Sequence, residues 1–171
     1  GLYRELQTSG QDAAALKNVN AFLDAVESFQ MINQQSSDSG RILMPFPVLS
    51  EAAFRFGQLL IDTGQANDSA DQGKQKVINI SFLLDMTRLG PLRADFSIFN
   101  QTLSGRFLLS DDQTRQYVES CVPELKERLE KSGYKLQTIS CVTAKPDELE
   151  QNVLIESFAR ARDNNMLNIV V

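Results

Sequence analysis

The chain has 171 residues, of which 42% are hydrophobic and 23% are charged, and its formal net charge is −5. A chain of this length buries about 70% of its unfolded surface, so it can form a core without a disulfide or a metal. The acidic balance argues against nucleic acid as a partner, and no apolar run reaches the roughly 20 residues that cross a bilayer.

The first segment has the spacing of an amphipathic helix. Apolar residues recur at intervals of three and four from Leu16 to Ile32, which places them on one helix face. Ser9 or Asp12 is the expected cap at its start, and the polar run 34–40 is expected to end it. Because helices are stabilised mainly by packing, we expect this one to pack on its own domain; a partner-binding helix is the alternative.

Residues 42–48 and 54–61 are predicted to form a hairpin. Pro45 and Pro47 have no N–H to donate to a neighbouring strand, so the first strand is expected at a sheet edge. The segment 62–75 is rich in Gly, Asp, Ser and Gln, which predicts a flexible connector. A lone hairpin is only marginally stable, so we expect a single domain that includes the whole chain rather than two lobes.

Three more strands are predicted before a long helix. Residues 78–86, 92–98 and 103–109 each alternate apolar and polar side chains, which is typical of strands with one buried face. The chain is expected to turn at Gly90, which supplies backbone freedom, and Pro91 prevents Gly90 from continuing a helix.

The long helix is predicted over 111–132. Ser110 and Gln113 fit a capping box, and Gly133 is a natural residue to end a helix. Residues 134–142 then return as a strand. These elements predict an α+β fold, in which a mixed or antiparallel sheet carries the long helix on one face and further helices come from both ends of the chain.

The tail is predicted to contain one more helix. Pro146 suits its first turn, and the apolar spacing continues to about Arg162. Residues 163–165 are expected to break it, and 166–171 to be extended. This end is expected to add a strand to the sheet; pairing with a partner's edge is the alternative.

Reactive side chains are few. The chain contains no histidine, which excludes the Ser-His-Asp and Cys-His arrangements of nucleophilic catalysis. Cys121 and Cys141 are the only cysteines, too few for a zinc site; we expect both to be buried as small hydrophobic residues, with a disulfide as the alternative. No phosphate-binding glycine motif occurs, so we predict no cofactor and no metal.

Carboxylates are the remaining side chains that could catalyse a reaction. Asp85, Asp95, Asp111 and Asp112 are the candidate acids. Alternation places Asp95 on the solvent side of its strand, and the other three suit caps or turns, whereas paired catalytic carboxylates need a cleft. We therefore predict no catalytic residue and a protein that is not an enzyme.

The predicted elements between residues 77 and 142 follow a fixed order: a strand, a Leu-Gly turn, a hairpin, a helix, a glycine and a return strand. The segments that carry the pattern are Leu89–Gly90, the alternation at Leu92, Ala94 and Phe96, Leu103–Phe107, Val122–Lys126 with Leu129, and Gly133–Leu136 with Ile139. In this order they resemble the C-terminal domain of bacterial flagellar hook-length control proteins. Met86 stands where that family usually has proline, three positions before the Leu-Gly pair.

The resemblance implies a non-enzymatic, protein-binding domain, namely the substrate-specificity switch of the flagellar type III export apparatus without the N-terminal region that measures hook length. It implies binding to the cytoplasmic domain of the export gate, and a cytoplasmic location with export through the same apparatus as a further expectation. Nucleic acid binding and membrane insertion are not expected. The partner-binding residues that it implies are Leu89, Gly90, Pro91 and Leu92. The alternative for these residues is a purely structural turn. For the whole protein, the alternative function is that of an unrelated interaction module with a similar βαβ layout, or of an acid-based hydrolase.

Overall fold

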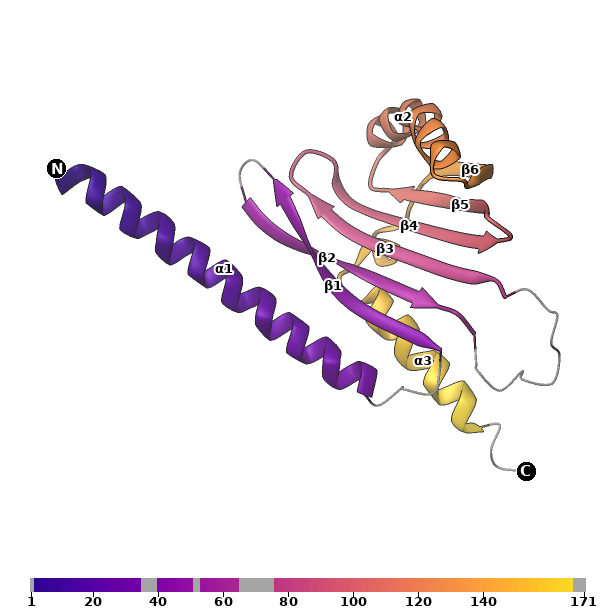
Figure 1. The fold of residues 1–171 in the computed structure, drawn as a ribbon, viewed down its shortest axis with the longest axis horizontal. Coiled ribbons are helices and arrows are strands. Elements are labelled where there is room, and N and C mark those ends of the chain that lie inside the picture. Colours follow the sequence, from indigo (N-terminus) through magenta and orange to yellow (C-terminus); the bar gives the residue numbers. More distant parts are fainter. Residues whose placement is uncertain (1, 35–39, 51–52, 65–75, 168–171) are drawn as a thin grey trace.

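The computed structural model describes residues 2–34, 40–50, 53–64 and 76–167. Its elements confirm the predicted α+β class, with a helix from each end of the chain and a long helix between strands (Figure 1). In chain order they are α1 (Leu2–Gln34), β1 (Arg41–Ser50), β2 (Ala53–Asp62), β3 (Ile78–Met86), β4 (Gly90–Phe99), β5 (Thr102–Leu109), α2 (Asp112–Lys131), β6 (Lys135–Thr143), the 3-10 helix η1 (Pro146–Leu149) and α3 (Val153–Leu167).

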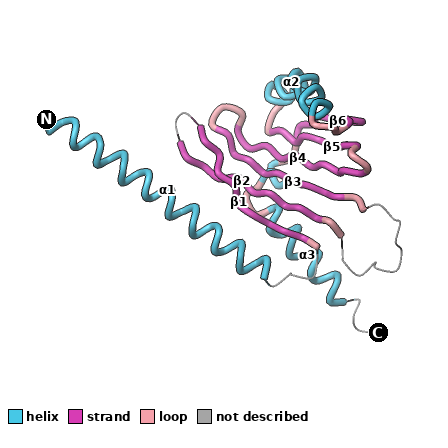
Figure 2. The backbone as a smooth tube through the Cα atoms, in the orientation of Figure 1, coloured by secondary structure: helices cyan, strands magenta, loops and turns pink. Residues whose placement is uncertain are grey.

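The six strands of the described residues lie side by side in sequence order, from β1 to β6. Neighbours from β1 to β5 pair antiparallel, which confirms the two predicted hairpins, whereas β5 and β6 are parallel. A parallel pair needs a crossover connection, and α2 forms it (Figure 2). The sheet, expected to be mixed or antiparallel, is mixed.

Side chains alternate along each strand, so the sheet has two faces. On one, called the α3 face, helix α3 and the C-terminal end of α1 cover strands β1 to β3. The buried side chains of this core are Phe29, Leu43, Leu60, Leu83, Leu154 and Phe158. Part of α1 therefore packs on its own domain, as expected.

The opposite face is called the α2 face. Here Leu92, Ala94 and Leu109 are buried, with Val118 of α2 and Cys141 of β6 packed against them. Helix α2 lies mainly on β6, with further contact to β5. The predicted packing of the long helix on one face of the sheet is thus confirmed, at the β6 end of that face.

Strand β1 forms one edge of the sheet, as its prolines predicted. The N–H of Leu43 donates to Oδ1 of Asn33 at 2.9 Å, and its C=O accepts from Nδ2 of Asn33 at 2.6 Å. Leu43 therefore directs its backbone groups away from β2, and by alternation Pro45 and Pro47 face the same side. Helix α1 and the two prolines together block this edge against a further strand.

The predicted starts of two helices are wrong. Helix α1 begins at Leu2, so that Ser9 and Asp12 lie within it rather than at its start; the residues before Ser9 include Leu, Arg and Glu, which favour helix. For α2 the N-cap is Asp111 rather than Ser110, because Asp111 has the extended backbone of a cap, with φ −152° and ψ 168°.

The tail also differs from its prediction. Pro146–Leu149 form a separate 3-10 turn, since Glu150 is extended with φ −66° and ψ 147°, and α3 begins only at Val153. Residues 163–165 do not break α3, which continues to Leu167. The end 168–171 and most of the connector, 65–75, lie outside the described residues, so those expectations stay predictions.

Candidate functional site

The turn between β3 and β4 is a tight connection of three residues, Thr87–Leu89, across which Met86 pairs with Gly90. Gly90 has a φ of +68°, in the left-handed region that costs residues with a side chain about 1–2 kcal/mol. Three-residue hairpin loops close with a residue in this conformation. The predicted turn and its need for glycine are therefore confirmed.

This turn lies against the start of α2. A Cβ added at Gly90 would be 3.3 Å from Oγ of Ser110. Ser110 in turn donates from Oγ to Oδ2 of Asp111 at 3.0 Å. Asp111 caps α2 by accepting from the backbone N–H of Thr114 at 2.8 Å, and from its hydroxyl at 2.9 Å. The hydrogen bonds of Ser110 and Asp111 thus fix the start of α2, and the turn lies next to it.

The four residues implied as partner-binding are not equally accessible. Leu89, Gly90 and Pro91 are half-buried at the turn. Leu92 is 7% exposed and belongs to the core of the α2 face, so its side chain serves packing. The exposed residues Thr87 and Arg88 form the tip instead. Their position just before the Leu-Gly pair, in the polar span between two predicted strands, is the signal that would have identified them.

The two acids at the start of α2 are engaged in the helix itself. Hydrogen bonds from the N–H and hydroxyl of Thr114, and then from Ser110, lower the pKa of Asp111 from its ordinary value of 3.8. The pKa of Asp112 is lowered chiefly by Arg115, whose Nε donates at 2.7 Å, and the same pairing raises the pKa of Arg115. Ionised carboxylates stabilise a helix N-terminus, so both acids act as structural anions.

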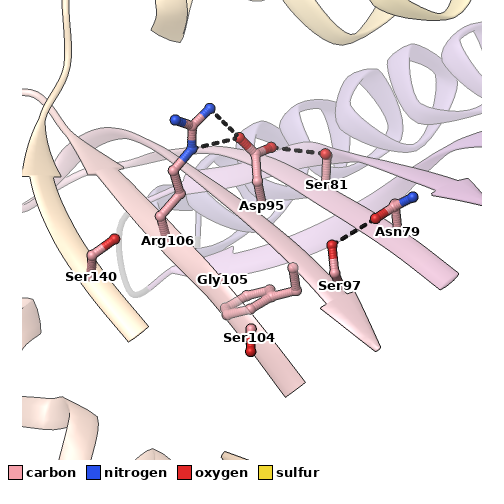
Figure 3. Close-up of a pocket in the computed structure, with 9 residues that line it drawn as sticks. Asn79, Ser81, Asp95, Ser97, Ser104, Gly105, Arg106 and Ser140 are labelled. Atoms are coloured by element: carbon pink, nitrogen blue, oxygen red, sulfur yellow. Dashed lines mark hydrogen bonds and ion pairs between the residues drawn. The ribbon is translucent and has the colours of Figure 1, made fainter. Parts of the chain in front are cut away.

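A shallow polar depression of about 330 Å³ lies on the α3 face of strands β3 to β6 (Figure 3). Polar side chains from four neighbouring strands line it: Asn79, Ser81, Asp95, Ser97, Ser104, Arg106 and Ser140. They share one face because Ser81 pairs with Asp95, Asp95 with Arg106, and Arg106 with Ser140.

Asp95 is the counter-ion of two arginines in this depression. Its Oδ1 accepts from Oγ of Ser81 at 2.8 Å and from Nε of Arg93 at 2.9 Å. Oδ2 accepts from Nε and Nη2 of Arg106 at 3.4 Å. Asp95 lies on the face that alternation predicted, yet its side chain is only 21% exposed because these partners surround it. A carboxylate held in this way is suited to fixing the two arginines.

The two cysteines do not form a disulfide. Cys121 and Cys141 are both free and half-buried, so the alternative of a disulfide is not seen, and the expected full burial is only partial. Burial raises the pKa of the Cys141 thiol, which disfavours the reactive thiolate. Within the part of the chain that the structure describes, no three His, Cys, Asp or Glu side chains gather as metal ligands, and no helix is long and apolar enough to cross a bilayer.

Residues 66–149 match the family model described as Flagellar hook-length control protein FliK. The match includes the whole segment 77–142 on which the resemblance was drawn, and it confirms that resemblance. It extends over β3, β4, β5, α2, β6 and η1, and so contains the Leu89–Gly90 turn, while α1, β1, β2 and α3 lie outside it. No curated protein and no solved structure matches the chain.

Proposed function

We propose that residues 66–149 form the substrate-specificity switch domain of a flagellar hook-length control protein, and that this domain binds the cytoplasmic domain of the type III export gate. The family match over these residues is the observation that carries the proposal. A cytoplasmic location, followed by export through the same apparatus, belongs to the same proposal.

The Leu89–Gly90 turn is the proposed contact. Its tip, Thr87 and Arg88, is exposed, and Leu89 and Pro91 retain part of their apolar surface. The turn is short, joins two paired strands and lies next to Ser110, and a short turn of this kind loses little conformational entropy when it binds. Docking then needs only backbone groups and apolar contacts, with no bond made or broken.

We also propose that the domain is not an enzyme. Support comes from the roles of the candidate acids, since Asp95 pairs with two arginines and Asp111 and Asp112 bind groups in the first turn of α2. These hydrogen bonds use the carboxylates as structural anions.

Titration of the chain with the purified cytoplasmic domain of the export gate from the same bacterium tests the proposal. Leu89→Asp places a charge at the turn and should weaken binding at least tenfold, about 1.4 kcal/mol. Leu89→Ala removes contact area without adding charge and should weaken binding by a smaller factor.

Val77→Asp is the matched control, because Val77 is an apolar residue, 46% exposed, at the opposite end of β3. It should leave binding unchanged. Circular dichroism establishes that each variant is folded. Equal binding by wild type, Leu89→Asp and Leu89→Ala would show that the turn is only structural, and failure of the wild type to bind would refute the proposed partner.

A further inference from the structure

The two edges of the sheet are protected to different degrees. At β1, two prolines and the C-terminal end of α1 block a further strand. Strand β6 forms the other edge, and among the described residues no strand lies beyond it. After the irregular pairing near its start, residues 138–143 include neither a proline nor a charged residue, which are the residues that usually protect an edge. The edge of β6 is therefore open to a further strand.

The backbone of β6 presents hydrogen-bonding groups at this edge. Ala144 donates its N–H to the C=O of Leu109 at 2.8 Å, so its backbone groups face β5. Because backbone directions alternate along a strand, the N–H and C=O groups of Ile139, Cys141 and Thr143 point away from β5. Such a row of donors and acceptors is the template on which an extended peptide adds as a strand.

Helix α2, which lies at this end of the sheet, is only partly covered on its apolar side (Figure 2). Its apolar residues share one side by their spacing, and each is only half-buried: Val118, Cys121, Val122, Leu125 and Leu129. By contrast, Leu154 and Phe158 of α3 are 0% and 3% exposed. The reason is that α2 packs mainly on β6, and no strand beyond β6 supports its outer side. Apolar side chains of an added strand would complete this cover.

On the α3 face, the same end of the sheet is cationic. Strands β5 and β6 contain Arg106 and Lys135 but no acid, in a chain whose net charge is −5. Arg106 lies beside Ser140 of β6 (Figure 3), and its side chain is 53% exposed. Its hydrogen bonds to Asp95 are 3.4 Å long, compared with about 2.9 Å in typical bonds. The guanidinium of Arg106 therefore keeps N–H groups with which to bind a second carboxylate.

We propose that the outer edge of β6 binds an extended segment of another protein, which adds a strand to the sheet. Successive side chains of a strand point to opposite faces, so the segment places apolar side chains beneath α2 and acidic side chains beside Arg106. A second copy of β6 lacks this chemistry, because it would bring Lys135 and no acid to the edge. This inference does not depend on the proposed export function.

Fluorescence anisotropy of the whole chain with a labelled peptide tests the proposal. The probe is a blocked peptide of about ten alternating valine and glutamate residues, the length of a long strand. Wild type should bind it saturably, and should bind the matched valine–lysine peptide at least tenfold more weakly. Arg106→Glu should reverse this preference. Arg160→Glu is the matched control, because Arg160 is an 80% exposed residue of α3, and it should leave both affinities unchanged.

Cys141→Pro tests the backbone contact, since proline removes one outward N–H and is tolerated at an edge. It should weaken binding of the valine–glutamate peptide at least tenfold in a chain that circular dichroism shows to be folded.

Hydrogen exchange measured by NMR locates the bound strand even if a variant fails to fold. In the free chain, the amides of Ile139, Cys141 and Thr143 should exchange faster than those of Ser140 and Val142, which face β5. Saturation with the valine–glutamate peptide should slow the three outward amides. Failure of wild type to bind, equal affinity for the two peptides, or binding that leaves these amides unprotected would overturn the proposal. So would protection in the free chain that grows with its concentration, because a second copy would then occupy the edge.

Discussion

Asn33→Ala tests whether the contact between α1 and the edge strand stabilises the fold. The side chain of Asn33 makes two hydrogen bonds to one residue, accepting from the N–H of Leu43 at 2.9 Å and donating to its C=O at 2.6 Å. Alanine removes both bonds and suits a helix, so helix propensity alone would favour the variant.

The expected loss follows from the burial of Leu43. A hydrogen bond contributes about 0.5–1.5 kcal/mol net, whereas a buried polar group left unpaired costs about 1–3 kcal/mol. Leu43 is 0% exposed, so water reaches its freed N–H and C=O poorly. We therefore expect Asn33→Ala to lower the free energy of unfolding by about 2–3 kcal/mol.

Urea denaturation followed by far-ultraviolet circular dichroism measures this loss, with no change expected in the m-value. Asn20→Ala is the matched control, because Asn20 is an exposed asparagine on the same helix; its effect should be within about 0.5 kcal/mol of zero. Hydrogen exchange at the Leu43 amide should also accelerate in Asn33→Ala. Equal stability of the two variants would refute the reasoning.

Three further perturbations have defined outcomes. Gly90→Ala should lower the free energy of unfolding in urea by about 1–2 kcal/mol, because the φ of Gly90, +68°, is left-handed. Adding Ser110→Ala should recover part of this loss if the contact with Oγ contributes to it. No recovery would show that the whole loss comes from the backbone conformation. Leu154→Ala removes a fully buried side chain from the α3-face core and should cost about 2–5 kcal/mol, so a loss below about 1 kcal/mol would contradict the packing of α3 on the sheet. Asp111 has a lowered pKa in the folded chain, so its contribution to stability is present above the unfolded value of 3.8 and is lost as the pH falls through the folded pKa. In Asp111→Asn, which still caps α2, the loss of stability between about pH 7 and pH 3 should be smaller than in wild type, and an equal loss would show that this carboxylate is not involved.

Local patterns in the sequence determined the elements of the sheet and the place of one edge. Alternation predicted strands β3, β4 and β5, because one face of such a strand is apolar where a core forms beneath it. Pro45 and Pro47 predicted the edge position of β1, since a residue without an N–H is excluded from the middle of a sheet. Gly90 and Gly133 marked a turn and a helix end, and both have positive φ, +68° and +86°.

The predicted bounds of helices were wrong where two neighbouring residues or segments suit the same role. Ser110 and Asp111 are both good caps, and only the path of the backbone from β5 into α2 selects Asp111. In the tail, Pro146 begins a short 3-10 turn rather than the helix predicted there, and the apolar spacing from Val153 serves the separate helix α3.

What the sequence by itself determined is the set of elements, their order and the resemblance between residues 77 and 142. Only the tertiary structure decided which apolar residues are covered: Leu92 of the implied partner-binding set is buried, whereas Ile42, in an equally apolar strand, is 49% exposed. The physical reason is that alternation and caps depend on residues close in the chain. Burial depends instead on which distant element lies across the sheet, and α3 covers one face of β1 to β3 while α2 lies at the other end of the opposite face.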